Sequence, residues 1–587
     1  MIRFHSLLAI AFSIIILTPS CTSDGPSQEE NSEDNTLRVQ QPTDVRTMNP
    51  LFGGSKYETA VYKLVFQELM DFDPSTQALT PKIVKSDPII EEITTGEYAG
   101  GLKFTYEILD EATWDDGLPI TGNDFLFSMK TVFNPKLPTT SLAAYFDNVV
   151  NIEVDDNNPK KFSVYTDNAY ILTKPGISNF VILPEHVYDP EGLSKDIPFA
   201  DLRKPENAKK YAEDENIAQF ATAFSDPKFE KETVVGSGPY KLVAWEPGDQ
   251  VVLAKKQNWW GEKLAGSNIH LEAHPDTIIF YPIQDQSATI AALKDEKIDV
   301  SGEIDSRMFL DLRQNEYASS IFNFFTPPTY TYFMTIINTR NPKLSDKRVR
   351  RALAHLIDMD LVISEVYNGL GARMVSPVFP EKPYFNNDLK PIEYDLEKAK
   401  ALLKEAGWED SNGNGILDKM IDGTRTELSL DYQYNPSSNF QENYTALLKD
   451  NAQKAGIEIN RKGLEFKAMQ QNSVNGDYEL GGRGSRWFPL PDDFKQLWHT
   501  DGIGVRSGNY PRFGNAESDA LIEAIRYNPD EAERNNQYKQ FQEIVYDEQP
   551  VIFILVPLAR VAVHKRFDPM LGQMGLSYQH FKLNTQP

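Results

Sequence analysis

Two adjacent carboxylates, Asp115 and Asp116, are of the type that could serve as general acid and general base in the hydrolysis of a glycan or a peptide. They lie in the segment Trp-Asp-Asp-Gly, residues 114–117. Neighbouring residues of a strand point to opposite faces, and Asp-Gly is a common turn signal. We therefore interpret the segment as a turn and do not expect the two carboxylates to converge on one substrate.

A second pair, His270 and His274, has the i, i+4 spacing that chelates zinc when the segment is helical. Pro275 and the alternating run at 277–281 argue against a helix at this point. The sequence offers no clear third or fourth ligand, so no metal site is predicted here.

Residues 410–418 place oxygen-bearing side chains at positions 1, 3, 5 and 9 of an EF-hand-like loop, with glycine at position 6. The weak calcium candidates are Asp410, Asn412, Asn414 and Asp418. Position 12, where calcium loops carry a bidentate glutamate, is Ile421, and Asn-Gly repeats form tight turns unaided. We favour a turn, with weak calcium binding as the alternative and no other cofactor.

Sequence signatures of hydrolases and nucleotide-binding proteins are absent. There is no Gly-x-Ser-x-Gly, no His-Glu-x-x-His and no phosphate-binding Gly-x-x-x-x-Gly-Lys-Ser/Thr segment. We therefore expect a protein that is not an enzyme. An exported hydrolase is the rival hypothesis, and it would require catalytic groups that converge in space.

The only cysteine, Cys21, follows an N-terminal segment typical of a signal peptide. Arg3 supplies the positive start, and residues 7–17 are apolar except for Ser13 but too few to span a bilayer. Ser20 is the small residue expected beside a cleavage site. A cysteine in this place is similar to the lipobox of bacterial lipoproteins, in which the thiol receives diacylglycerol.

We therefore predict a signal peptide at 1–20, lipidation of Cys21, and an acidic disordered tether at 21–36. The alternative is an ordinary secretory peptide with an incidental cysteine. A lone exported thiol has no disulfide partner, so lipid attachment explains it better. The expected location is the periplasm, with the chain anchored to a membrane by its N-terminal lipid.

The remaining sequence is that of a water-soluble, acidic body. Lys and Arg number 59 against 85 Asp and Glu, a formal net charge of −26. Such a surface repels phosphate backbones, so nucleic acid is not an expected partner. After the N-terminal segment, no stretch reaches the roughly 18 apolar residues of a transmembrane helix.

Both strand and helix periodicities occur. Apolar residues alternate at 103–108, which predicts a half-buried strand. A helix capped by Ser345 or Asp346 is expected to bury Val349, Ala352, Leu353, Leu356 and Ile357. Another is expected to begin near Asp395, to bury Ala399, Leu402, Leu403 and Ala406, and to end at Gly407. This mixture favours an α/β fold.

Seven segments, taken in order, resemble those of a known family: MNPLF (48–52), WDDGLPITGNDFLFSM (114–129), GSGPYKLVAWEPGDQVVLAKKQNWWG (236–261), AALKDEKIDV (291–300), DKRVRRALAHLIDMDLVISEVYNGLG (346–371), YDLEKAKALLKEAGW (394–408) and GDYELGGRGSRW (476–487). They are similar to the extracytoplasmic solute-binding proteins, family 5, that serve ABC importers of oligopeptides, dipeptides and nickel. The resemblance extends from about residue 40 to about residue 560.

This resemblance implies a two-lobed periplasmic-binding-protein-like α/β fold, with hinge strands and an extra subdomain inserted in the first lobe. The hinge is expected near 327–335, with the return to lobe I near Leu555. The implied boundaries are lobe I at 37–81, 183–326 and 555–587, the inserted subdomain at 82–182, and the ligand-binding lobe II at 327–554.

In oligopeptide-binding relatives, the loop that matches 480–494 lines the cleft and carries an aspartate that holds the α-ammonium group of the peptide. Without gaps, that aspartate falls on Trp487, and the tryptophan of the family falls on Gly484. Asp492 and Asp493 could replace the missing anion only if the loop followed a different path.

Arg483 and Arg486 flank Ser485 in this loop. Together with Gly484, Trp487 and the upstream Phe466, they are the expected ligand-binding residues. Guanidinium groups and an indole suit a carboxylate, a phosphate or a sugar at least as well as an amine. The alternative for Arg486 and Trp487 is packing between the lobes.

The leading expectation is a monomeric, lipid-anchored receptor that captures a short peptide or similar solute and delivers it to an ABC permease. A non-peptide solute, such as an oligosaccharide, an anionic metabolite or a nickel chelate, is the first alternative. A sensory module that binds solute without transport is a further one.

Overall fold

The computed structural model describes residues 34–505, 508–572 and 575–584. The predicted signal peptide, Cys21 and most of the predicted tether lie outside these residues. Thr36–Pro587 forms one compact unit. Over the described ranges, no helix combines the length and the apolar character needed to cross a membrane.

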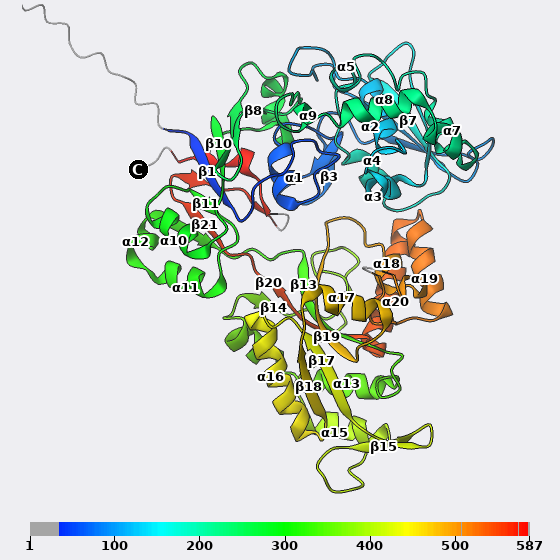
Figure 1. Ribbon diagram of the computed structural model, residues 1–587, viewed down its shortest axis with the longest axis vertical. Coiled ribbons are helices and arrows are strands. Elements are labelled where there is room, and N and C mark those ends of the chain that lie inside the picture. Colours follow the sequence, from blue (N-terminus) through cyan, green and yellow to red (C-terminus); the bar gives the residue numbers. More distant parts are fainter. Residues whose placement is uncertain (1–33, 506–507, 573–574, 585–587) are drawn as a thin grey trace, which may run out of the picture. The chain divides into compact units, whose positions relative to one another are not determined.

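Lobe I is built on a seven-stranded sheet in the order β12-β21-β11-β1-β10-β9-β8 (Figure 1). Its strands are β1 (Thr36–Gln41), β8 (Tyr240–Glu246), β9 (Gln250–Lys255), β10 (Thr277–Pro282), β11 (Val300–Ser301), β12 (Phe322–Phe325) and β21 (Val561–His564). β1 is central and parallel to both β10 and β11, and it buries Leu37 and Val39 completely. Leu37 and Val39 are two residues apart and so point to the same face of the sheet, which is therefore covered at its centre.

Short helices and a hairpin complete lobe I. They are α1 (Lys56–Tyr62), α10 (Gln286–Lys294), α11 (Ser306–Gln314), α12 (Glu316–Ile321) and the hairpin β2 (Met70–Phe72) with β3 (Leu79–Pro81). The carboxylate of Glu58 holds the start of α1, because it accepts hydrogen bonds from the backbone N–H groups of Gly54 and Ser55 and from the Arg46 guanidinium. This capping box fixes the position of Tyr57.

A separate antiparallel sheet in the order β4-β5-β7-β6 lies between β3 and β8 in the sequence. Its strands are β4 (Ile89–Glu92), β5 (Leu102–Glu107), β6 (Val149–Val154) and β7 (Lys161–Thr166). All four fall inside the predicted insertion, 82–182, and β5 coincides with the predicted strand at 103–108. The helices between β5 and β8 in the sequence are α2 (Gly122–Val132), α3 (Thr140–Ala143), α4 (Thr173–Ser178), α5 (Glu185–Tyr188), α6 (Phe199–Arg203), α7 (Ala208–Ala212), α8 (Glu215–Phe224) and α9 (Lys228–Lys231).

Lobe II is built on a six-stranded sheet in the order β14-β20-β13-β19-β17-β18. Its strands are β13 (Thr331–Ile337), β14 (Gly371–Ala372), β17 (Ser429–Tyr434), β18 (Glu458–Gly463), β19 (Leu480–Arg486) and β20 (Val551–Pro557). A hairpin of β15 (Asp418–Ile421) and β16 (Thr424–Glu427) projects from it. The helices are α13 (Lys347–His355), α15 (Leu396–Glu405), α16 (Asn439–Lys454), α17 (Phe466–Asn475), α18 (Lys495–Trp498), α19 (Ala516–Tyr527) and α20 (Glu531–Glu548).

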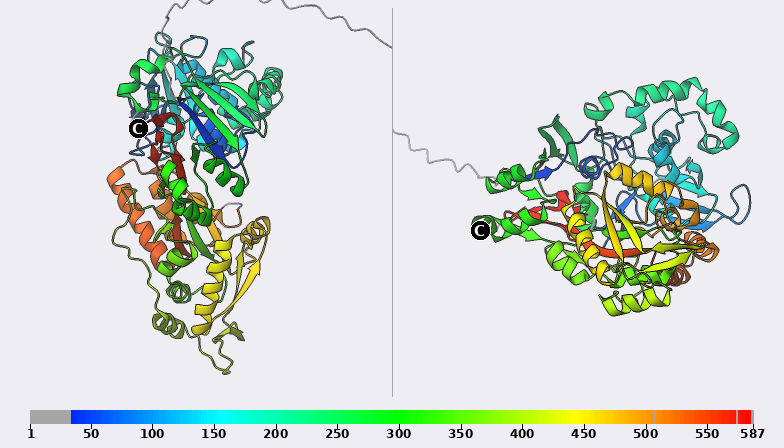
Figure 2. Two further views of the ribbon diagram at one scale, coloured as in Figure 1. Left: turned by 90° about the vertical axis from the view of Figure 1, so that its left-hand side faces the viewer. Right: turned by 60° about the horizontal axis from the view of Figure 1, so that its bottom comes forward.

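Helices cover both faces of the lobe II sheet, as Figure 2 shows. Along β20, Ile552 and Ile554 join the core beneath α13, α15 and α16, whereas Val551 and Phe553 join the core beneath α19 and α20. Alternate residues of a strand point to opposite faces, so an unbroken apolar strand is what a sheet covered on both faces requires.

Two chain segments connect the sheets, at 326–330 between β12 and β13 and at 558–560 between β20 and β21. They lie side by side, because the backbone N–H of Ala559 donates to the carbonyl of Pro327 at 2.8 Å. Paired short connectors are a common form of hinge. The first lies at the start of the predicted hinge, and β20 ends at Pro557 rather than at the predicted boundary, residue 554.

The two predicted helices of lobe II form with small differences. The carboxylate of Asp346, rather than the hydroxyl of Ser345, caps α13 and accepts from the Arg348 N–H at 2.9 Å. Leu356 and Ile357 are buried as predicted but lie just beyond the last residue of α13. α15 begins after its predicted cap, Asp395, and ends before Gly407.

Candidate ligand-binding site

The predicted ligand residues lie on β19 and in the loop that follows it. β19 pairs along its length with β13, and Arg486 is opposite Thr331 at the strand's end. Its side chains alternate, because Arg483 is buried, Ser485 is half-buried, and Gly484 and Arg486 are exposed. The strand therefore offers only part of the predicted set to a ligand.

Arg483 belongs to the interior of lobe II. Its guanidinium donates to the carbonyl of Met469 at 2.9 Å and to the hydroxyl of Ser473 at 2.7 Å, both on α17. Burial lowers the pKa of Arg483. The guanidinium also lies 5.5 Å from the ring centroid of Phe466, whose side chain is 59% exposed. Arg483 thus positions α17 and leaves the ring of Phe466 open to contact.

Trp487 is 9% exposed and packs in the core of lobe II. Its indole stacks on the ring of Tyr332 at 6.4 Å and meets the ring of Phe494 edge-on at 6.1 Å. Its backbone N–H donates to the carbonyl of Tyr330 at 2.7 Å. The indole N–H is buried, with no hydrogen-bond partner in the part of the chain that the structure describes. Both the packing role and the ligand role predicted for Trp487 remain compatible with this position.

Arg486 has a different environment. Its guanidinium lies 5.6 Å from the ring centroid of Phe488, which is 48% exposed. In lobe I, the hydroxyl of Tyr57 donates to Glu303 at 2.7 Å. Burial and this hydrogen bond raise the pKa of Tyr57, whereas the nearby positive charge of Arg486 acts in the opposite direction. Arg486 is therefore an exposed residue of the predicted set whose charge acts on a group of lobe I.

The two aspartates that could have replaced the missing amine-binding anion are both engaged. The carboxylate of Asp492 is buried, pairs with Lys382 and accepts from the hydroxyl of Tyr384 at 3.1 Å. The carboxylate of Asp493 accepts from the hydroxyl of Tyr170 at 2.5 Å and from Nε of Arg526 at 3.0 Å. Neither is placed to bind the ammonium group of a ligand.

Reasoning from the sequence did not identify Tyr57 or Phe488. Phe488 directly follows Trp487, and a second large aromatic residue in a polar loop is a signal that could have found it. Tyr57 lies on α1, far from the loop in sequence, so only the fold brings it near Arg486.

The two carboxylates of residues 114–117 do not converge. Asp115 pairs with Lys256, whereas Asp116 lies 2.6 Å from Nε2 of His186. The backbone N–H of Gly117 donates to the carbonyl of Trp114 at 3.0 Å, which closes the predicted turn.

The two histidines with zinc spacing also have separate partners. Nε2 of His270 is 2.8 Å from the hydroxyl of Thr80, whereas Nε2 of His274 is 3.1 Å from Glu272. Within residues 34–505, 508–572 and 575–584, no group of three His, Cys, Asp or Glu side chains is arranged to hold a metal.

The calcium candidates form a self-supporting turn. The carboxylate of Asp410 accepts from the backbone N–H groups of Gly413 at 2.7 Å and Gly415 at 3.0 Å. The carboxylate of Asp418 accepts from the backbone N–H and the hydroxyl of Ser411. This is the interpretation that the sequence favours, and calcium binding stays a prediction.

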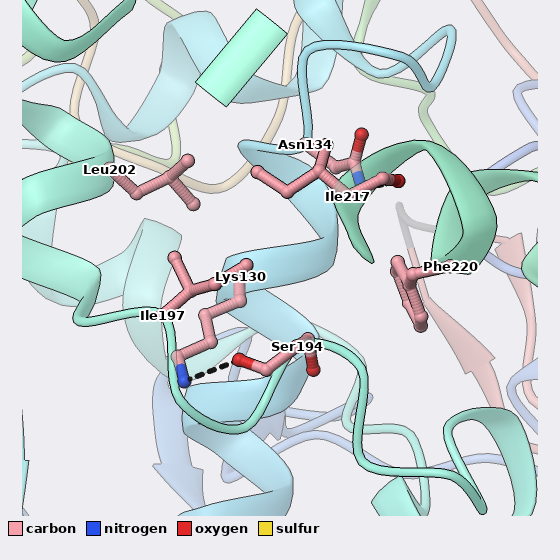
Figure 3. Close-up of a pocket in the computed structure, with 7 residues that line it drawn as sticks. All are labelled: Lys130, Asn134, Ser194, Ile197, Leu202, Ile217 and Phe220. Carbon is pink, nitrogen blue, oxygen red and sulfur yellow. Dashed lines mark hydrogen bonds between the residues drawn. The ribbon is translucent and has the colours of Figure 1, made fainter. Parts of the chain in front are cut away.

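Two pockets lie away from β19. The one in Figure 3, between α2 and residues 194–220, is lined by Lys130, Asn134, Ser194, Ile197, Leu202, Ile217 and Phe220. Its volume of about 10 Å³ is that of one water molecule. A larger hollow of about 750 Å³ lies beside α19 and α20, and the guanidinium of Arg350 in its wall is bonded to Glu548 and to backbone carbonyls. Neither contains a residue of the predicted site.

Comparison with known proteins agrees with this geometry. The family model described as bacterial extracellular solute-binding proteins, family 5 Middle, matches residues 89–504. The oligopeptide-binding protein AppA of Bacillus subtilis (strain 168) is 24% identical over 584 residues, which cover 96% of this chain and 95% of that protein.

Solved structures show the same fold. AppA from Bacillus subtilis in complex with a nonapeptide has a TM-score of 0.65 at 21% identity, covering 94% of this chain and 99% of that one. NikA from Brucella suis in complex with Fe(III)-EDTA has a TM-score of 0.72 at 18% identity, covering 94% and 100%. The two-lobed fold and the family implied by the seven segments are therefore confirmed, and the chain belongs to the bacterial extracellular solute-binding proteins of family 5.

Proposed function

We propose that the chain is the receptor of an ABC import system and captures a short peptide between lobes I and II. The observation that carries this proposal is the pair of adjacent hinge segments, 326–330 and 558–560, which join two lobes with separate sheets. A ligand with a higher affinity for the closed arrangement would drive closure by that difference alone. The resemblance to AppA over nearly the whole chain supports a peptide as the ligand.

The aspartate that holds the α-ammonium group of the peptide in oligopeptide-binding relatives has no counterpart here, because Asp492 and Asp493 are engaged with Lys382 and Arg526. Exposed aromatic rings and a guanidinium, at Phe466, Phe488 and Arg486, are the contacts available on lobe II. A non-peptide anion, such as a metabolite or a chelate, is the second candidate, and the guanidinium of Arg486 is the observation that favours it.

The proposal also covers membrane attachment, the partners of the receptor and the fate of the ligand. Cys21 carries a lipid that holds the protein at the periplasmic side of a membrane, and the receptor acts as a monomer that delivers its ligand to permease subunits. The protein is not an enzyme, so the ligand leaves unchanged. Calcium at Asp410, Asn412, Asn414 and Asp418 is a separate proposal, to be tested by a rise in the melting temperature when calcium replaces a chelator.

The decisive experiment is mass spectrometry of the ligand that copurifies with a soluble form beginning at Thr22. Bound peptides, recovered intact after incubation and accompanied by closure in small-angle scattering, are the expected result. Bound non-peptide anions would favour the second candidate. Cleavage of the ligand during incubation would favour the hydrolase hypothesis.

A further inference from the structure

Gly484 is a glycine that the backbone itself does not require. It lies inside β19, and its φ is outside the left-handed region that favours glycine. A side chain is disfavoured instead by the ring of Phe333 on the neighbouring strand β13, because a Cβ added at Gly484 would lie 3.3 Å from Cδ1 of that ring. Glycine weakens the interior of a strand and often marks a place where another group approaches the backbone closely. The glycine therefore makes room for the ring of Phe333.

Phe333 and Gly484 face the same side of the sheet. They are paired directly in the antiparallel register of β13 and β19, and paired residues point to one face. Arg486, two residues further along β19, points to this face as well. Gly484 and Arg486 are both exposed, so this face is open to solvent at the end of the strand.

Two further rings extend the surface that begins at Phe333. The ring centroid of Phe440, on α16, lies 5.4 Å from that of Phe333, and the centroid of Tyr367 lies 5.2 Å from Phe440 and 6.1 Å from Phe333. All three rings are half-buried, whereas Tyr444, which stacks on Phe440, is buried. The three rings are therefore the accessible end of an aromatic cluster that continues into the core of lobe II.

This surface suits a large apolar side chain. The rings of Phe333 and Phe440 have no group that could replace the hydrogen bonds that a polar side chain makes with water. Since Gly484 has no side chain, a ligand that lies along the end of β19 can place one of its own there, against the ring of Phe333. The gain in affinity grows with the apolar area that is removed from water, so it is small for alanine and largest for phenylalanine or leucine.

We propose that Gly484 and the ring of Phe333 form a binding position for a large apolar side chain of the ligand, so that this receptor selects peptides by one bulky apolar residue. This inference rests on the proposed peptide-binding function and names the class of peptide. The rings of Phe440 and Tyr367 extend the position and cover part of the side chain that enters it. The competing explanation is that the ring of Phe333 only shields the glycine, as aromatic residues do elsewhere in sheets.

The test uses synthetic alanine pentapeptides in which one position at a time carries Phe, Leu or Asn. Affinities are measured by calorimetry with wild type, Gly484→Leu and Phe333→Leu, and the melting temperature of each protein is recorded without peptide. Gly484→Leu fills the proposed position, whereas Phe333→Leu removes the aromatic ring and leaves the position open. The matched control is Gly266→Leu, because Gly266 is an exposed lobe I glycine at which an added Cβ would meet no atom within 4 Å.

At one peptide position, wild type and Gly266→Leu are expected to bind the Phe and Leu peptides about tenfold more tightly than the Asn and Ala peptides. Gly484→Leu is expected to bind all of them with similar affinity, and Phe333→Leu to lose most of the preference. If Gly484→Leu does not fold, Phe333→Leu decides, because the preference must fall in that variant too.

Three results would contradict these expectations. A lower melting temperature of Gly484→Leu with an unchanged preference shows that Phe333 only shields the glycine, and it overturns the inference. Equal binding of all peptides by wild type overturns it without any variant and leaves the receptor function intact. Binding of no peptide at all overturns the proposed function and this inference with it.

Discussion

Asp492 and Asp493 are adjacent in the sequence, yet their carboxylates connect the ligand loop to different parts of the molecule. Asp492 pairs with the buried Lys382 inside lobe II. Asp493 joins Arg526 of lobe II to Tyr170 of the inserted subdomain. The loop after Trp487 is therefore fixed to its own lobe at one residue and contacts the other side of the hinge at the next.

Replacing Tyr170 by Phe should weaken closure. The substitution removes only the hydroxyl that donates to Asp493 at 2.5 Å, a hydrogen bond to a charged group worth about 1.5–3 kcal/mol. Some of that free energy favours closure, so ligand affinity should fall several-fold and the unliganded protein should have a larger radius of gyration in small-angle scattering.

The control for this change is Tyr165→Phe. The Tyr165 hydroxyl donates to Glu153 at 2.7 Å within the inserted sheet, so the same chemical change is made without a contact to lobe II. If the two variants show equal affinity and equal radius of gyration, the contact between Tyr170 and Asp493 has no role in closure.

Replacing Asp492 by Asn should destabilise lobe II. Burial raises the pKa of Asp492 and lowers that of Lys382, and their ion pair offsets that burial. The Asp492→Asn substitution would leave the ammonium group of Lys382 buried without a counter-charge, at a cost of about 3–5 kcal/mol. Denaturant unfolding at neutral pH measures the loss.

The double variant Lys382→Met with Asp492→Leu removes both charges and should recover much of that stability. Wild-type stability of Asp492→Asn alone would show that the pair is more hydrated than its burial implies.

Glu58 should make stability depend on pH in the acid range. Burial raises its pKa, but the Arg46 guanidinium and the backbone N–H groups of Ser55, Gly54 and Arg46 together lower it to about 2, from its usual value of 4.5. A carboxyl whose folded pKa lies below its unfolded pKa stabilises the fold above the unfolded value, and that contribution is lost as the pH falls from about 4.5 to about 2.

Glu58→Gln should therefore lower the melting temperature near neutral pH and flatten its decrease between those pH values. Glu262→Gln, at an exposed position of lobe I, is the matched control and should follow wild type. A Glu58→Gln profile parallel to that of wild type at every pH would exclude this residue as the source.

The sequence predicted local structure well where a periodic apolar pattern coincided with a cap. Asp346 and Asp395 cap the helices that the spacing of their buried residues indicates, and the strand at 103–108 alternates as expected. These features depend on neighbours within a few residues, so a single sequence contains what determines them.

The sequence could not predict which side chains contact one another at the site, because these contacts join residues that are distant in the sequence. Arg483 and Arg486 are arginines of the same strand, yet Arg483 is buried and donates to α17, whereas Arg486 is exposed beside Phe488. The alternation of side chains along a strand does not by itself say which face is buried and which is exposed. That depends on the elements that pack against the strand. The hydrogen bond from Tyr170 to Asp493 could not be predicted for the same reason, because only the fold brings these two residues together.

Trp487 offers the last prediction, since packing and ligand contact make different demands on it. Trp487→Ala should destabilise lobe II by about 3–5 kcal/mol, because the indole packs on Tyr332 and Phe494. Loss of affinity in that variant is therefore ambiguous, and Trp487→Phe, which keeps an aromatic ring in the core, is the informative change. If the indole also contacts the ligand through its buried N–H, which lacks a partner among the described residues, Trp487→Phe should retain most stability and lose about tenfold in affinity. Unchanged affinity in a stable Trp487→Phe protein would limit Trp487 to supporting the strand that presents Arg486.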